Sequence, residues 1–215
     1  MEKIIVVQGD SITDAGRNKD LPTSVGVGYA NLVKAHLTAN EPYQYQFYNR
    51  GISGNRVVDL YARIKADMIN LQPDYMSILI GVNDVWHEYT RKNGVSAEKF
   101  EMVYSLMIEE LQQALPNLKI FILEPFVLPG SATENNEEHP ARWEYFRTEV
   151  ELRAQAAARV AKKYNLPFVP LQKMFDQANA DAPESGYWLS DGVHPTPAGH
   201  ELIKQQWLQK FQELK

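Results

Sequence analysis

The 215-residue sequence predicts an α/β protein, a three-layer α/β/α sandwich in which helices cover both faces of a parallel β-sheet. Short runs of β-branched and aromatic residues alternate along the chain with longer segments of helical periodicity. The connections between the runs are short crossovers, which in proteins give parallel strands with helices on both faces. At 44% hydrophobic residues, this length suits one domain spanning residues 1–215 with a sizeable core.

Five apolar runs are the predicted strands. The first, residues 4–7, is β-branched throughout, and a glycine turn follows it closely, as is typical of a buried central strand. The others, in chain order, are residues 45–49, 75–80, 119–123 and 168–169. The sheet is therefore expected to have five parallel strands.

The segments between the strands predict the helices. Helical periodicity covers residues 29–37, 57–69 and 143–164. A further helix begins after Ser96, which can act as its N-cap, and ends at Pro116. The last helix has Thr196 as its N-cap and Pro197 as its first residue. The apolar stripes of these last two helices predict core positions: Phe100, Val103, Met107, Leu111, Ala114, Ile203, Trp207, Phe211 and Leu214.

Charge and composition limit the classes of partner. The net charge is −5 and there is no basic cluster, which disfavours nucleic acid or an anionic membrane and fits a small neutral substrate. The chain has no cysteine for disulfides or a thiol mechanism. Met1 leads directly into the first strand without a signal-peptide pattern, and no apolar segment approaches the roughly 20 residues that span a bilayer. We therefore expect a cytoplasmic protein and leave open whether it forms homo-oligomers.

A hexapeptide at the end of the first strand has the composition of a catalytic loop. Gly9-Asp10-Ser11-Ile12-Thr13-Asp14 places a serine where ligands bind in open α/β sheets, just outside the carboxyl end of a strand. Ser and Asp are also common helix N-caps, so this segment alone leaves a purely structural interpretation open.

Three further segments of similar character follow strand-like runs. They are Gly51-Ile52-Ser53-Gly54-Asn55, Gly81-Val82-Asn83-Asp84 and, near the end, Asp191-Gly192-Val193-His194. In this order the four segments resemble the four blocks of the SGNH hydrolases, the GDSL-type esterases. The resemblance spans nearly the whole chain. It implies a flavodoxin-like sandwich and carboxylic ester hydrolysis without a metal or cofactor.

The resemblance also implies a role for each block. Ser11 would be the nucleophile, His194 its general base, and Asp191 the carboxylate that orients the imidazole. The Ser11 N–H, the Gly54 N–H and the Asn83 side-chain amide would form the oxyanion hole. Without the family, Asp191 could instead be an Asx-turn residue and Asn83 could bond its own loop.

Several neighbouring residues receive weaker assignments. Asp10, Asp14 and Asp84 are expected to orient the backbone around the site or to face water. The other four histidines receive no catalytic role: His36, His87, His139 and His200. Thr13 stands where the nucleophile elbow of α/β-hydrolases has glycine, which argues against that fold.

The blocks look most like those of bacterial acetylxylan esterases and related carbohydrate deacetylases, which implies short acetylated sugars as substrates. Trp86 and Trp188 are the candidate sugar-stacking residues among six aromatics near the site, although core packing is the more frequent role of such residues. The other four are Tyr89, Trp143, Tyr145 and Tyr187. Ser190 departs from some acetylxylan esterases, which have tryptophan before the aspartate.

Other interpretations stay open. Residues 125–140 form a long polar insertion, either a lid, a subunit contact or a surface loop. Within the same fold, a lysophospholipase or thioesterase is the alternative activity. Two interpretations come from other classes. A metal-dependent phosphoesterase would be expected to have an Asp-x-His and a Gly-Asn-His-Asp segment, which this sequence lacks. An inactive sugar-binding module would not need every catalytic residue, and this sequence has them all.

Overall fold

The computed structural model describes residues 2–215, so the predicted start at Met1 lies outside the described residues. The described chain forms one five-stranded sheet in the order β2-β1-β3-β4-β5, and every pair of neighbours is parallel. The strands are β1 (Lys3–Gly9), β2 (Tyr45–Asn49), β3 (Tyr75–Leu79), β4 (Lys119–Leu123) and β5 (Phe168–Val169). The predicted α/β class and parallel sheet are confirmed.

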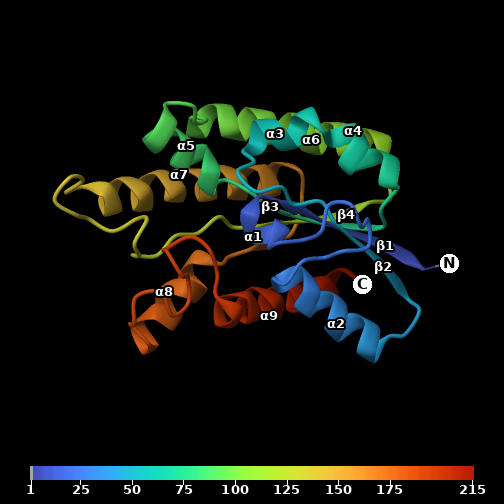
Figure 1. The fold of residues 1–215 in the computed structure, drawn as a ribbon. Coiled ribbons are helices and arrows are strands. Elements are labelled where there is room, and N and C mark those ends of the chain that lie inside the picture. Colours follow the sequence, from blue (N-terminus) through green and yellow to red (C-terminus); the bar gives the residue numbers. More distant parts are fainter. Residues whose placement is uncertain (1) are drawn as a thin grey trace.

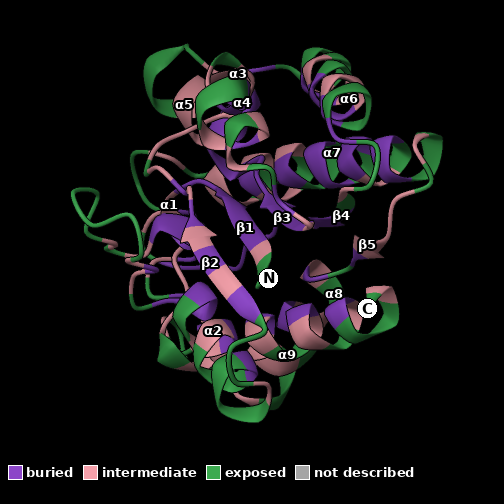
Figure 2. Cartoon of the chain, turned by 90° about the vertical axis from the view of Figure 1, so that its right-hand side faces the viewer, coloured by how far each residue is buried: buried purple, intermediate pink, exposed green. Residues whose placement is uncertain are grey.

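Helices cover both faces of the sheet (Figure 1). On one face lie α2 (Tyr29–Asn40) and α9 (Pro197–Leu214), and on the other lie α3 (Val57–Ala62), α4 (Ile64–Asp67), α6 (Ala97–Ala114) and α7 (Arg142–Lys163). Figure 2 shows the strands buried between these layers, with the exposed residues on the outer surfaces of the helices.

The central strand explains the two cores. Successive side chains of a strand point to opposite faces, so β1 contributes residues to the core on each face of the sheet. Ile5 and Val7 pack in one apolar cluster with α2 and α9, whereas Val6 packs in the other with α3 and α6. All three are fully buried, which accounts for a run without polar alternation. Trp207 also links α9 to the sheet by a hydrogen bond, because its Nε1 donates to Ser77 Oγ on β3 at 2.9 Å.

The predicted helix at 57–69 is interrupted in the structure. It is divided into α3, α4 and a 3₁₀ turn at Ile69–Leu71, with Arg63 between the first two. The guanidinium of Arg63 reaches the end of β1, where it donates to Gln8 Oε1 at 2.7 Å, and it donates to Arg50 O at 2.8 Å. The break thus falls at the residue whose side chain makes these long-range bonds, which a periodicity argument does not detect.

Three helices lie where the sequence analysis assigned no helix. They are α1 (Ser11–Asp14), α5 (Val82–Arg91) and α8 (Gln172–Asp181). Both α1 and α5 begin inside the predicted catalytic blocks, so Ser11 and Asn83 lie in the first turns of helices that directly follow strands. The predicted core stripes are largely buried, but Ala114 at the end of α6 is exposed.

The parallel arrangement determines where the blocks meet. β1, β2 and β3 are adjacent and end at the same edge of the sheet, so the loops that carry Ser11, Gly54 and Asn83 follow neighbouring strand ends. Among the described residues, no helix combines the length and apolar character needed to cross a membrane.

Candidate active site

Ser11 occupies a tight turn between β1 and α1. Asp10 is the N-cap of α1, and its Oδ1 accepts the Ile12 N–H at 3.0 Å. Ser11 follows as the first residue of the helix. The turn requires glycine before it, because a Cβ at Gly9 would lie 2.4 Å from both Leu79 O and Thr13 Oγ1. The serine is therefore held at the strand end by close backbone packing.

A continuous hydrogen-bonded chain joins the first and last blocks. Ser11 Oγ lies 2.9 Å from His194 Nε2, and His194 Nδ1 lies 2.7 Å from Asp191 Oδ2. The Asp191 side chain also accepts the backbone N–H groups of Val193 and His194, at 2.9 and 2.8 Å. The three residues that the sequence analysis singled out are thus brought together, with the imidazole between the hydroxyl and the carboxylate.

The electrostatics of this chain follow from the same contacts. Burial raises the pKa of Asp191, but the hydrogen bonds from the His194 ring and from the two backbone N–H groups outweigh it, and its pKa is about 2. The hydrogen bond to Asp191 raises the pKa of His194 above its usual 6.5, against an opposing effect of burial. Asp191 is therefore ionised at neutral pH and favours the protonated imidazole.

The insertion at residues 125–140 supports the turn that carries Asp191. Leu128 N–H donates to Gly192 O at 2.9 Å, and Thr133 Oγ1 donates to Leu128 O at 2.6 Å. Gly192 has a φ of +96°, and a Cβ there would lie 2.3 Å from Thr133 Oγ1. The first half of the insertion is therefore part of the scaffold beneath the turn, and residues 134–138 are exposed. Sequence patterns gave no sign of this contact.

Gly54 and Asn83, the expected oxyanion-hole residues, lie in the loop after β2 and in the first turn of α5. Gly54 has a φ of +82°, a conformation that side chains disfavour, and a Cβ there would meet His87 Nε2 at 4.0 Å, an ordinary contact distance. Asn83 is the second residue of α5 and is nearly buried. Its Nδ2 donates to Asn55 O at 3.2 Å, which uses one of the two amide hydrogens. The other hydrogen remains for a ligand.

Asp14 connects the first block to the second. Its Oδ2 accepts both the N–H and the Oγ–H of Ser53 at 3.0 Å. Arg17 and Lys19 lie 3.8 and 3.7 Å from its carboxylate oxygens, and Arg17 also donates to Gly51 O. Because Gly54 directly follows Ser53, this carboxylate fixes the loop that bears it relative to α1.

Two further aspartates are buried close to the site. Burial raises the pKa of Asp10 to about 7, opposed by its bond from Ile12 and by nearby His194. Asp84 is fully buried, both of its oxygens accept the Val57 N–H at 3.2 Å, and burial raises its pKa well above the usual value. Both accept loop N–H groups, so they orient the backbone and do not face water.

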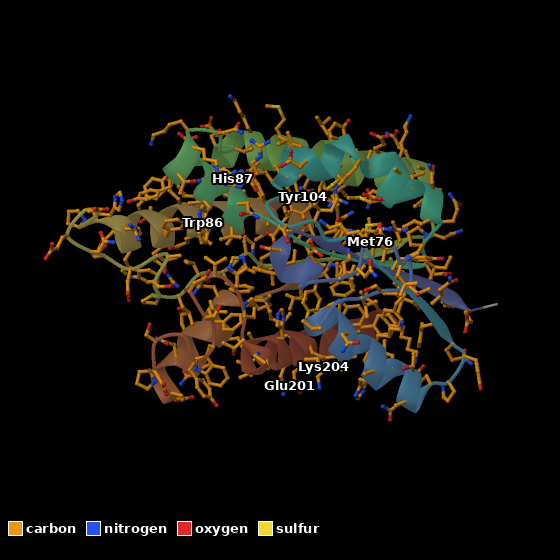
Figure 3. All side chains as sticks on the ribbon, in the orientation of Figure 1. Met76, Trp86, His87, Tyr104, Glu201 and Lys204 are labelled. Carbon is orange, nitrogen blue, oxygen red and sulfur yellow. The ribbon has the colours of Figure 1, made fainter. Side chains whose placement is uncertain are left out.

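The two candidate stacking residues lie in different surroundings. Trp86 follows Asn83 on α5 (Figure 3), and its ring centroid lies 6.1 Å from that of His194. Trp188 donates its indole N–H to Ala178 O at 3.0 Å and packs edge-on against Tyr187. Trp86 is therefore beside the imidazole, whereas the polar end of Trp188 is engaged by α8. Tyr89 and Tyr145 pack against each other and against Phe146.

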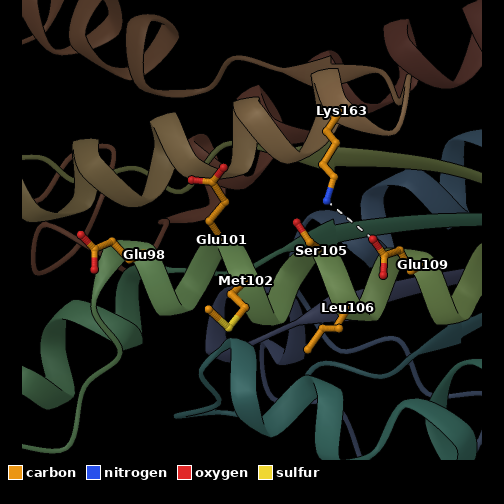
Figure 4. A pocket seen from close by; sticks show the side chains of 7 residues that line it. All are labelled: Glu98, Glu101, Met102, Ser105, Leu106, Glu109 and Lys163. Carbon is orange, nitrogen blue, oxygen red and sulfur yellow. Dashed lines mark ion pairs between the residues drawn. The ribbon is translucent and has the colours of Figure 1, made fainter.

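Cavities in the surface differ in chemistry. The one that contains Ser11 and His194 has a volume of about 250 Å³ and is also lined by His200, which was not predicted to have a catalytic role. A larger hollow of about 420 Å³ lies between α6 and α7 (Figure 4), where Lys163 pairs with Glu109 beside Met102 and Leu106. It holds none of the predicted site residues. Within residues 2–215, no group of three or more His, Cys, Asp or Glu is arranged to hold a metal ion.

Comparison with known proteins agrees with this geometry. Residues 7–202 match the model of the GDSL-like lipase/acylhydrolase family. The chain belongs to this family. It is 32% identical to an acetylxylan esterase of Geobacillus stearothermophilus over 98% of this chain and 94% of that protein.

Solved structures of GDSL-type proteins have the same fold. A protein of Parabacteroides merdae described as a GDSL-like lipase superposes with a TM-score of 0.88 at 35% identity, covering 97% of this chain and 96% of that one. The acetylxylan esterase of G. stearothermophilus superposes with a TM-score of 0.82 at 30% identity, covering 97% and 93%. The predicted family and its sandwich fold are confirmed, and the GDSL-type chain described here is a carboxylic ester hydrolase.

The Asp14 contacts give a prediction about stability. Asp14→Ala removes the buried carboxylate that accepts the Ser53 N–H and hydroxyl, and the loss of these two bonds to a charged group should lower the free energy of unfolding by roughly 1–3 kcal/mol. Urea unfolding measures the change. Asp20→Ala, at an exposed position in the next loop, is the matched control and should stay within about 0.5 kcal/mol of wild type. Equal stability of the two variants would contradict the assignment.

Proposed function

We propose that this chain is a serine esterase that removes acetyl groups from short acetylated carbohydrates, such as xylo-oligosaccharides, through an acyl-enzyme. The observation that carries the proposal is the hydrogen-bonded chain from Ser11 Oγ through His194 to Asp191. The carbohydrate part is supported by the 32% identity to an acetylxylan esterase over nearly the full length.

Acylation begins at Ser11. Its Oγ attacks the ester carbonyl carbon while His194 Nε2, 2.9 Å away, takes the hydroxyl proton. The carbonyl oxygen becomes negatively charged and accepts hydrogen bonds from the N–H groups of Ser11 and Gly54 and from Asn83 Nδ2. The carbon–oxygen bond to the alcohol then breaks, and Nε2 delivers its proton to the departing oxygen.

Deacylation repeats these steps with water. Nε2 takes a proton from a water molecule, the water oxygen attacks the acetyl carbon, and the bond to Ser11 Oγ breaks as the serine regains a proton. Asp191 holds the imidazole through Nδ1, so Nε2 faces Ser11 in both halves of the reaction.

A covalent probe tests the nucleophile. An organophosphate should label Ser11, as located by mass spectrometry, and Ser11→Ala should lose hydrolysis of a short-chain aryl acetate while it remains folded. The same assay in excess chelator should give the wild-type rate. Absence of labelling together with chelator-sensitive turnover would replace this mechanism with the metal-dependent phosphoesterase interpretation.

The pH dependence tests the base. His194 must be neutral to accept a proton, and the bond to Asp191 raises its pKa above 6.5, so kcat/KM should rise with pH with a midpoint above 6.5. Asp191→Asn removes the carboxylate that stabilises the imidazolium, so the midpoint should fall and the rate should drop by several orders of magnitude, about 10⁴-fold in a comparable triad.

Asp10 provides the control for this profile, because its pKa of about 7 lies in the same range. Asp10→Asn keeps the side-chain oxygen that accepts the Ile12 N–H and removes the titration. The rise in kcat/KM should persist in this variant. If the rise in kcat/KM disappears in Asp10→Asn, the pH dependence arises from Asp10 and not from His194.

Asn83 tests the oxyanion hole. Asn83→Ala removes one donor that acts mainly on the transition state, so kcat should fall about 100- to 1000-fold with a much smaller change in KM. Steady-state kinetics measure this split, with circular dichroism to confirm folding. Asn40→Ala, on the exposed end of α2, should match wild type. A loss confined to KM would be inconsistent with the role.

A further inference from the structure

The cavity beside Ser11 and His194 has a distinctive lining. Its other walls come from the end of α1, the residue before the α2 cap and the start of α9: Ile12, Ala15, Val27, Pro195, Pro197 and His200. The aliphatic side chains and the two prolines make most of this surface apolar, and none of the lining side chains is a carboxylate, a lysine or an arginine. A neutral ligand with apolar faces fits such walls.

His200 gives the cavity one oriented polar group. Its Nδ1 accepts the Tyr29 N–H at 3.1 Å, so the proton of the neutral ring is on Nε2. Burial lowers the pKa of His200 to about 4, with a smaller effect of nearby His194, so the ring is neutral when His194 is neutral. Nε2 donates to no other group within residues 2–215, which leaves it as a donor for a ligand.

The chemistry of the triad indicates which part of an ester enters this cavity. His194 Nε2 must reach the alcohol oxygen to protonate it, so the alcohol leaves on the His194 side of Ser11. The cavity is lined by His194 and by the residues that follow it. Gly54 and Asn83, the expected partners of the carbonyl oxygen, do not line it. The alcohol side therefore faces the cavity.

We propose that this cavity is the subsite for the alcohol part of the ester, and that the Nε2–H of His200 donates a hydrogen bond to a hydroxyl or ring oxygen of that alcohol. This inference rests on the proposed function and deepens it. At about 250 Å³, slightly below the ~300–1,000 Å³ of typical whole-ligand sites, the cavity suits one ring of a substrate. A pyranose combines apolar C–H faces with oxygen acceptors, which matches the apolar walls and the single donor.

Val27 allows the subsite to be blocked without disturbing the fold, because its side chain is 79% exposed. In Val27→Trp the indole fills the mouth of the cavity. The ratio of kcat/KM for cyclohexyl acetate to that for vinyl acetate should fall about tenfold, because the cyclohexyl ring needs the cavity and the vinyl group is small. Leu21→Trp, at an exposed apolar position in the same loop, is the matched control and should keep the wild-type ratio.

His200 tests the donor. His200→Asn keeps a side-chain oxygen that can accept the Tyr29 N–H but removes the donor at Nε2. For a monoacetylated methyl xyloside, kcat/KM should fall about three- to tenfold relative to cyclohexyl acetate, which has no hydroxyl to accept the bond. Thermal unfolding checks that the α2–α9 contact survives the substitution.

The outcomes separate this inference from the proposed function. Vinyl acetate hydrolysis by the wild-type protein reports on the esterase mechanism, and the variant ratios report on the cavity. If Val27→Trp instead changes the ratio of vinyl butyrate to vinyl acetate and leaves the alcohol series unaffected, the cavity binds the acyl group and the proposal is overturned. The proposal is also overturned if Val27→Trp lowers kcat/KM equally for cyclohexyl acetate and vinyl acetate, or lowers it for neither.

Discussion

The site depends on backbone N–H groups in its loops and helix starts whose acceptors are aspartate side chains. Loops at the end of a parallel sheet lack the pairing that strands provide, and a buried N–H without a partner is costly. The first block contributes two aspartates that satisfy this need, and the third and fourth blocks contribute one each. The pairs are Asp10 with Ile12, Asp14 with Ser53, Asp84 with Val57, and Asp191 with Val193 and His194. Asp14 joins the first block to the second, Asp84 joins the third block to the start of α3, and the bond from Asn83 to Asn55 O joins the third block to the second, so these segments form one framework.

Burial of a carboxylate disfavours its charged form, and this effect differs among these aspartates. Asp191 is partly exposed and well supplied with donors, and its pKa falls to about 2. Asp10 and Asp84 are buried with fewer donors, and their pKa values rise. The ionised carboxylate thus lies next to the imidazole that must be stabilised as a cation, while the carboxyl groups that only hold backbone are closer to neutrality. Positive charge on His194 is accordingly stabilised mainly from its Nδ1 side.

The sequence predicted what depends on local pattern. Residues 4–7 predicted a strand buried on both faces, and Thr196-Pro197 predicted the start of α9, because side-chain periodicity and helix caps depend on residues that are close in the chain. The blocks identified the family because they follow strand ends in a recognisable order. Long-range bonds could not be predicted from local pattern: Arg63, at the break between α3 and α4, bonds Gln8, and Leu128 and Thr133 support the Asp191 turn. The bond from the Tyr29 N–H to His200 Nδ1 joins residues 171 positions apart, so local pattern gives no indication of it either.

The two halves of the site are built by different kinds of constraint. Ser11, Gly54 and Asn83 lie at adjacent strand ends, and side-chain bonds between their loops fix them to one another. His194 and Asp191 lie three residues apart on a single turn that is anchored separately by the insertion. The cavity lies where the first half meets the second, between α1 and the start of α9. Substitutions at Val27, on its exposed rim, change no bond of either half, so the shape of the alcohol can be selected there while the reacting groups stay in place.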